Sequence, residues 1–126
     1  MDCVGFFNSA HKQLEQFSDD LQESDVRSIV HMAYYYVYHL CIEKLGEKAF
    51  GRDSLKHSDV ESRLRSYKGL DPVIQDAKRY FTSLKALRVL ADYKLEYQLT
   101  ADEAEDAVEW AQKLRITALK ELKNAS

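Results

Sequence analysis

The chain has 126 residues, a formal net charge of −3, two cysteines, four glycines and one proline. This length suits one domain, residues 1–126, that buries about two thirds of the surface of its unfolded chain. The mild acidity argues against a general nucleic-acid coat protein but not against a local basic site. Two cysteines far apart in sequence indicate free thiols in a reducing compartment rather than a disulfide framework.

The N-terminal stretch MDCVGFFNSAHKQ has neither the basic start nor the apolar run of a signal peptide. Charged or histidine residues interrupt every apolar stretch before it reaches the ~20 residues that a membrane span requires. We therefore expect a cytoplasmic, soluble protein with no membrane partner. Glycine and proline are scarce and no alternating run of β-branched residues occurs, so the fold class is predicted to be all-α.

The chain is organised around residues 25–45, DVRSIVHMAYYYVYHLCIEKL, which contain no glycine or proline. Apolar residues recur there at helical spacing in two adjacent rows, which leaves little polar face. This pattern predicts a central helix covered on most sides. Ser24 is the expected N-cap, with Asp25 at the positive end of the helix dipole.

Four further helices are predicted from apolar spacing and from start signals, over residues 4–18, 58–69, 71–95 and 100–122. The start signals are two capping boxes and one cap followed by proline: Ser58 with Glu61, Thr100 with Glu103, and Asp71 with Pro72. Four long helices and one short helix, joined by short links, predict an up-and-down helical bundle. The charged stretch of residues 47–57 is expected to be a loop.

The central helix carries four tyrosines within five positions: Tyr34, Tyr35, Tyr36 and Tyr38. Successive helical residues point about 100° apart, so at least one row of these rings is expected to face away from the protomer core. Two interpretations are open. Either the rings are partly buried with their hydroxyls in water, or they anchor a homodimer interface, where tyrosine is enriched.

The familiar signatures of metal and cofactor sites are missing. His31 and His39 lie on roughly one side of the central helix, but with Cys41 and His11 they do not form a recognised metal-binding spacing. We expect no metal and no cofactor, and His39 is predicted to be a buried, hydrogen-bonded imidazole. Glycine-rich phosphate loops and the serine nucleophile elbow are also missing from the sequence.

Residues 51–57, GRDSLKH, place basic side chains and a histidine in a polar loop before a predicted helix start. A loop His57 beside Arg52 and Lys56 has the composition to act as a general acid or base near a phosphate held by the cations. The alternative is an ordinary solvated loop. Sequence alone leaves both open.

Residues 87–93, LRVLADY, place Arg88 four positions before Asp92 on a mostly apolar helix, followed by Tyr93. At this spacing the guanidinium reaches the carboxylate, so an ion pair is expected. The same three side chains are also candidates for a binding site.

Three segments in order resemble the HEPN (higher eukaryotes and prokaryotes nucleotide-binding) domain family, over residues 25–120. Residues 31–39, HMAYYYVYH, are similar to its paired tyrosines followed by an aromatic residue and histidine. Residues 56–60, KHSDV, are similar to its histidine-containing entry into a short helix. Residues 87–93, followed by a turn and an alanine-rich helix, are similar to its last two helices.

The resemblance implies a dimer whose long helices form a cleft. In the nuclease branch of the family, an arginine and a following histidine project into that cleft and cut RNA without a metal. Here Asp92 stands near the position of that histidine, whereas Arg52 and His57 have the arginine-to-histidine interval but lie in the earlier loop.

The resulting hypothesis is a HEPN-type homodimer of a prokaryotic toxin–antitoxin or defence system that acts on RNA as a ribonuclease or binds a nucleotide. It assigns proton transfer to His57 and phosphate binding to Arg52 or Arg88, with Asp92, Tyr93, Tyr35 and His39 in the binding cleft. The alternative is a non-catalytic dimerisation module that binds a nucleotide or a partner, such as a cognate antitoxin or nucleotidyltransferase.

Overall fold

The computed structural model describes residues 3–16, 22–45 and 57–125, without the side chains of residues 57–59 and 125. These residues form five helices: α1 (Val4–Gln16), α2 (Glu23–Leu45), α3 (His57–Ser66), α4 (Pro72–Tyr93) and α5 (Ala101–Ala125). Within the described ranges there is no strand. The predicted all-α class, with α3 as the short helix, is therefore confirmed.

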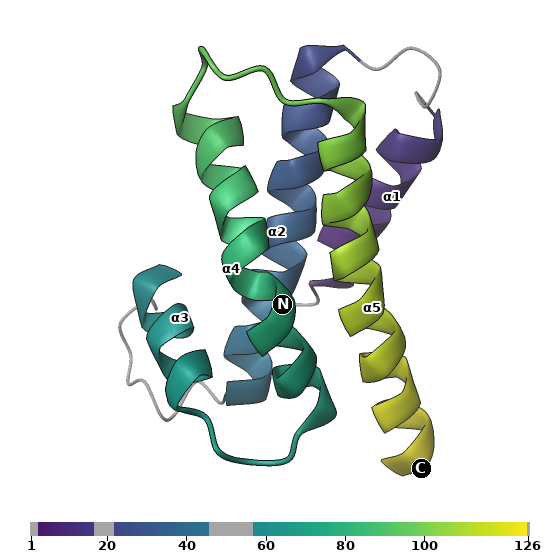
Figure 1. Cartoon of the computed structure of the whole chain (residues 1–126). Helices are drawn as coiled ribbons and strands as arrows, with labels where there is room; N and C mark the ends of the chain where they lie inside the picture. The colour runs from purple at the N-terminus through teal and green to yellow at the C-terminus, as the bar shows by residue number, and fades with distance from the viewer. Residues whose placement is uncertain (1–2, 17–21, 46–56, 126) are drawn as a thin grey trace.

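Helix α2 is the centre of the bundle and packs against all four other described helices (Figure 1). Its apolar side chains at Ile29, Val30, Ala33 and Val37 are completely buried. Because neighbours cover α2 on different sides, apolar groups all round its axis are removed from water, which accounts for its weakly amphipathic sequence. This packing also fixes which residues of α2 lie beside which residues of α4.

Most of the tyrosine rings of α2 are buried within the protomer. Tyr34, Tyr36 and Tyr38 are all buried within the protomer, and only Tyr35 is half-exposed. Their rings pack against other elements of the same chain, as Tyr34 does with Phe81 of α4 and Tyr36 with Phe7 of α1. At least one row was expected to face away from the core, and the Tyr35 row is the one that is partly exposed, whereas the helices that flank α2 on opposite sides bury the other three rings.

Two of the predicted helix starts are confirmed by their hydrogen bonds. Asp71 Oδ1 accepts from the backbone N–H of Val73 at 2.8 Å and of Ile74 at 3.3 Å, ahead of α4. At α5, the Thr100 hydroxyl accepts from the Glu103 N–H at 3.2 Å, and the Glu103 carboxylate accepts from the Thr100 N–H at 3.0 Å. Each cap satisfies backbone donors that have no partner within the helix.

The other two start signals were read at the wrong residue. Helix α2 begins at Glu23, so Ser24 lies inside the first turn, and Asp25 accepts instead from the Gln22 N–H at 3.2 Å. Helix α3 begins at His57, so Ser58 also lies inside the helix. The Glu61 carboxylate accepts from Thr82 and Lys85 of α4.

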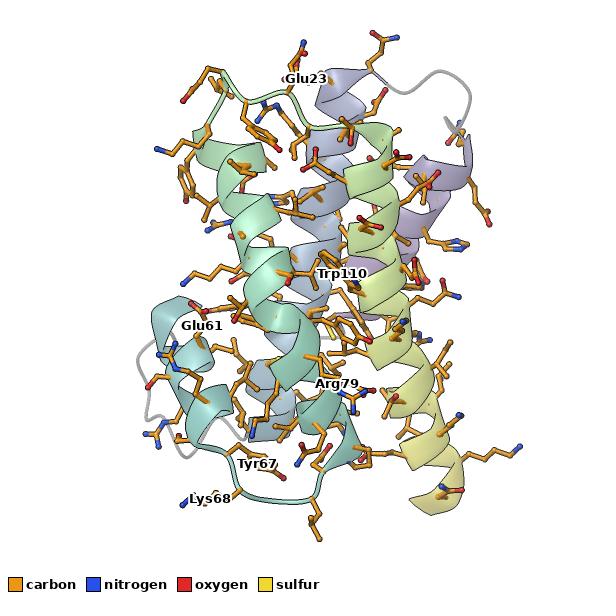
Figure 2. The ribbon with its side chains drawn as sticks, in the orientation of Figure 1. Glu23, Glu61, Tyr67, Lys68, Arg79 and Trp110 are labelled. Atoms are coloured by element: carbon orange, nitrogen blue, oxygen red, sulfur yellow. The ribbon has the colours of Figure 1, made fainter. Side chains whose placement is uncertain are left out.

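Helix α3 runs antiparallel to α4 along one side of the bundle, where Figure 2 labels Glu61 and Tyr67. Glu61 contacts Lys85, whereas six residues later the Tyr67 carbonyl accepts from Lys78. The helix ends at Ser66, before the predicted end at Gly69, and the Tyr67 hydroxyl folds back to accept from the Asp71 N–H at 3.0 Å. A Cβ at Gly69 would lie 2.3 Å from that hydroxyl, so a larger residue there would have to displace the Tyr67 ring.

Cys3 and Cys41 are free and buried, as the sequence indicated. Burial raises the pKa of the Cys41 thiol, which keeps it protonated and unreactive. The loop predicted over residues 47–57 lies outside the described residues except for His57, which begins α3, so the prediction was wrong at that residue. Across the helices that are described, none combines the length and apolar character needed to cross a membrane.

Candidate functional site

A buried polar cluster lies where the first half of α2 meets the last two turns of α4. The helices are antiparallel, so residues 27–35 of α2 face residues 88–97 of α4 and the following turn, at the upper end of the bundle in Figure 1. Below this level the α2–α4 contact is aromatic and apolar, as at Tyr34 and Phe81. The polar cluster is thus a local interruption of an otherwise apolar packing surface.

Arg88 is the buried centre of the cluster. Its Nε donates to Asp92 Oδ2 at 2.9 Å, which is the predicted ion pair, and its Nη2 donates to the hydroxyls of Tyr35 at 3.1 Å and Tyr93 at 3.2 Å. The guanidinium also lies 5.0 to 5.6 Å from the ring centres of Tyr34, Tyr35 and Tyr93. These contacts compensate the cost of burying a charge.

The electrostatics of the cluster keep Arg88 charged. Burial by itself would lower the pKa of the guanidinium, but Tyr35, Tyr93 and Asp92 outweigh it and raise that pKa. A permanently charged guanidinium with a shared carboxylate holds both side chains in one geometry. The cluster is therefore rigid rather than a freely rotating surface charge.

His31 extends the cluster from α4 back to α2. Its Nδ1 lies 2.9 Å from Asp92 Oδ2 and 3.1 Å from Oδ1. Because the carboxylate can only accept, Nδ1 is the ring nitrogen that carries a proton, and Nε2 takes no part in the contact. Asp92 thus receives Arg88 on one side and His31 on the other.

Solvent exposure increases along this chain of contacts. The exposed fraction of the side chain is 9% for Arg88, 22% for Asp92 and 38% for His31. The charge is therefore anchored in the protein interior, and the imidazole is the member that solvent or a ligand can reach. This arrangement can orient an imidazole for proton transfer, with the Asp92 carboxylate fixing its tautomer.

Arg27, one turn before His31, fixes the end of α4. Its Nη1 donates to the backbone carbonyls of Leu90 at 2.8 Å and Ala91 at 2.9 Å, and Nη2 reaches the carbonyls of residues 94, 95 and 97. The Leu90 and Lys94 carbonyls also accept from the Lys94 and Tyr97 N–H groups, so Arg27 adds a side-chain donor to the backbone at the end of α4 and in the turn after it. Arg27 therefore holds the backbone that carries Asp92 and Tyr93.

The two remaining binding candidates flank the cluster. The Tyr35 ring lies 4.5 Å from the His31 ring and 6.0 Å from that of His39. His39 itself is half-buried and stacks on Phe6 of α1 at 5.4 Å, so the expected buried, hydrogen-bonded imidazole was wrong. Burial lowers the pKa of His39, which keeps the ring neutral near neutral pH.

The structure brings Arg88, Asp92, Tyr93 and Tyr35 into direct contact, with His39 at their edge. Arg52 lies outside the described residues. His57 is the first residue of α3, and its side chain also lies outside them. From the antiparallel pairing of α3 and α4, the backbone of His57 is one helical turn beyond the Glu61–Lys85 pair, in the direction of Arg88.

Sequence reasoning missed the contact between His31 and Asp92. Its signal was present but weak, because His31 and Tyr35 stand four residues apart on α2 and Arg88 and Asp92 four apart on α4. Two such pairs meet face to face only when the register of the two helices is known. Among the described residues, no group of His, Cys, Asp and Glu has the arrangement of a metal site.

Comparison with known proteins gives one match. The family model described as HEPN domain matches residues 5–122. No curated protein and no solved structure matches the chain.

Proposed function

Because this chain belongs to the HEPN domain family, we propose that it is a homodimer of a prokaryotic toxin–antitoxin or defence system that cleaves RNA without a metal. The observation that carries the proposal is the chain of contacts from Arg88 through Asp92 to His31. A single domain over residues 1–126 and a cytoplasmic location are part of it.

The chemistry of RNA makes such a site sufficient. RNA carries its own nucleophile, the 2′-hydroxyl beside each phosphodiester, so cleavage requires no activated water. It requires a group that exchanges a proton and positive charge near the phosphate oxygens. An imidazole and a guanidinium that share one carboxylate bring both kinds of group to one place on the protomer.

The surface around the cluster suits a single-stranded ligand or a second protomer. Tyr93 is 63% exposed, Leu95 is 75% exposed and Tyr97 is 41% exposed, all beside the cluster at the end of α4. Exposed aromatic rings next to a cation are stacking platforms for unpaired bases. A contiguous exposed apolar edge is also typical of protein interfaces.

The first experiment incubates the purified protein with total RNA in a chelator and looks for fragments with 2′,3′-cyclic phosphate ends. The Arg88→Ala variant is expected to have no cleavage activity, because the substitution removes both the ion-pair partner of Asp92 and the cation of the site. His57→Ala and Arg52→Ala test the loop residues, which remain proposed as a proton donor or acceptor and as a phosphate clamp. Light scattering measures whether the active species is a dimer. No fragments from the wild-type protein would contradict RNA cleavage.

The second candidate is a non-catalytic dimer that binds a nucleotide or docks a partner such as a cognate nucleotidyltransferase. The observation in its favour is the burial of Arg88, whose Nε and Nη2 already donate to groups of the same chain. A dimer with no RNA fragments, but with saturable binding of a nucleotide or of a partner, would favour this second function.

A further inference from the structure

We propose that His31, on α2, is the catalytic residue that moves the proton in RNA cleavage, and that Asp92 is its positioning residue. This inference rests on the proposed function. It assigns proton transfer to a helix on which the family resemblance placed no catalytic histidine. The evidence is the geometry of the His31–Asp92 contact and the surroundings of the other histidines.

The imidazole of His31 has a defined tautomer and a reachable second nitrogen. Nδ1 must carry the proton that Asp92 accepts at 2.9 Å, so in the neutral ring Nε2 holds the lone pair. A general base needs such a nitrogen within hydrogen-bond reach of the hydroxyl proton. Because the side chain is 38% exposed, a ligand can approach it.

The groups around His31 are suited to this role. Asp92 faces it from α4, the Tyr35 ring contacts it from the next turn of α2, and Arg27 from the preceding turn is occupied by backbone carbonyls of the α4 end. Arg88 holds Asp92 from the interior, so the carboxylate stays in place while the imidazole gains and loses a proton. Asp92 thus acts through His31 without contacting the reacting atoms.

The other described histidines lack this setting. His11 on α1 lies 3.5 Å from Glu15, one turn later on the same exposed face, with no buried cation behind the carboxylate. His39 is half-buried against Phe6, and burial disfavours its charged form. His31 is the one of these three that combines exposure with a carboxylate anchored in the interior.

The step balances without a co-reactant. His31 Nε2 takes the proton of a ribose 2′-hydroxyl, and the 2′-oxygen forms a bond to the adjacent phosphorus. The bond from phosphorus to the 5′-oxygen of the next nucleotide breaks, and the imidazolium returns the proton to that oxygen through a water molecule. The products are a 2′,3′-cyclic phosphate and a 5′-hydroxyl, with no net gain or loss of protons or electrons.

The test compares single-turnover cleavage of one RNA oligonucleotide, in chelator, by the wild-type protein and four variants. His31→Ala and the polar replacement His31→Gln are expected to slow cleavage by about a hundredfold or more while still binding the RNA. His11→Ala, a histidine of similar exposure beside a carboxylate, is expected to stay within about twofold. Asp92→Asn should slow the cleavage step at saturating RNA while leaving the affinity for RNA within about twofold, because the imidazole loses the carboxylate that fixes its tautomer and orientation.

The outcomes separate this inference from the proposed function. No cleavage by the wild-type protein overturns RNA cleavage itself, and the His31 assignment with it. Wild-type cleavage that survives in folded His31→Gln overturns only the His31 assignment, and loss in His57→Ala alone would move proton transfer to α3. Loss in both His31 variants, with circular dichroism unchanged and His11→Ala active, supports the inference.

Discussion

Arg27 and Arg88 lie at the same end of the bundle and are both largely buried, yet they have opposite kinds of partner. Arg27 donates chiefly to backbone carbonyls at the end of α4, together with Glu23 on its own helix. Arg88 donates to side chains, namely Asp92 and the hydroxyls of Tyr35 and Tyr93. Arg27 thus fixes the backbone at the end of α4, and Arg88 provides the positive charge of the site on that backbone.

The difference matters because backbone acceptors do not titrate and side chains do. The contacts of Arg27 contribute to stability at any pH at which the fold exists. The contacts of Arg88 lead to a carboxylate and an imidazole, so their energy is connected to proton movement. The contacts from buried Arg88 through Asp92 to the more exposed His31 are therefore the part of the structure on which the proposed chemistry depends.

The largest expected effect comes from Arg88→Met. Removing the guanidinium leaves a largely buried Asp92 carboxylate and two tyrosine hydroxyls without their shared donor, which costs about 3–5 kcal/mol of unfolding free energy. Urea denaturation measures the loss. The control is Arg79→Met, an exposed arginine of the same helix labelled in Figure 2, which should stay within about 0.5 kcal/mol. Equal losses of unfolding free energy in the two variants would show that the buried contacts of Arg88 contribute no more stability than an exposed arginine does.

Arg27→Met is expected to have a smaller and more local effect, about 1–2 kcal/mol, because the released carbonyls at the end of α4 can turn to water. Hydrogen exchange should accelerate at the Lys94 and Tyr97 amides, which bond to Leu90 and Lys94 in this turn. Amides in the centre of α2 should keep their protection. Uniform acceleration across the bundle would show that Arg27 stabilises more than the helix end.

Glu61 provides a pH test away from the site. Its hydrogen bond with Lys85 lowers the pKa of the Glu61 carboxyl, so the pair contributes stability above the ordinary glutamate value of about 4.5 and loses it as pH falls through the lowered value. Glu61→Gln should therefore cost about 1 kcal/mol at pH 7 and progressively less as pH falls below about 4.5. Thermal melts across this range measure the difference. A cost that does not depend on pH would contradict the ion-pair explanation.

The smallest effect is expected at His39. Burial lowers its pKa from the ordinary value of 6.5, so the unfolded chain binds the proton more readily. Stability should therefore fall as pH drops through the usual histidine range, and His39→Phe, which keeps a ring against Phe6, should flatten that fall. Melting temperatures between pH 8 and pH 5 measure the slope. An unchanged slope would show that His39 does not contribute to it.

The sequence predicted the contacts between residues that lie close together in the chain. The Asp71 cap before Pro72, Thr100 with Glu103, and Arg88 with Asp92 each depend on residues no more than four positions apart, and all three contacts are present. Contacts across helices were not predictable in this way. The burial of Tyr36 depends on α1, and the Arg27 cap depends on carbonyls more than sixty residues away.

The site was accordingly found in part. Arg88, Asp92 and Tyr93 carried a visible pattern on one helix, whereas Tyr35 and His31 joined them only through the register of α2 against α4. Glu61 shows the opposite error. Its spacing from Ser58 indicated only a capping box, whereas in the structure a lysine of α4 gives the carboxylate a charged partner that the local spacing did not predict.

The measurement that tests the central claim most directly is a histidine-resolved NMR titration with an RNA whose 2′-hydroxyls are methylated, so that it binds but cannot be cut. If the Arg88–Asp92–His31 chain is the functional site, the ring resonances of His31 shift on binding and those of His11 do not. RNA binding that shifts His57 or His11 and leaves His31 unchanged would contradict it.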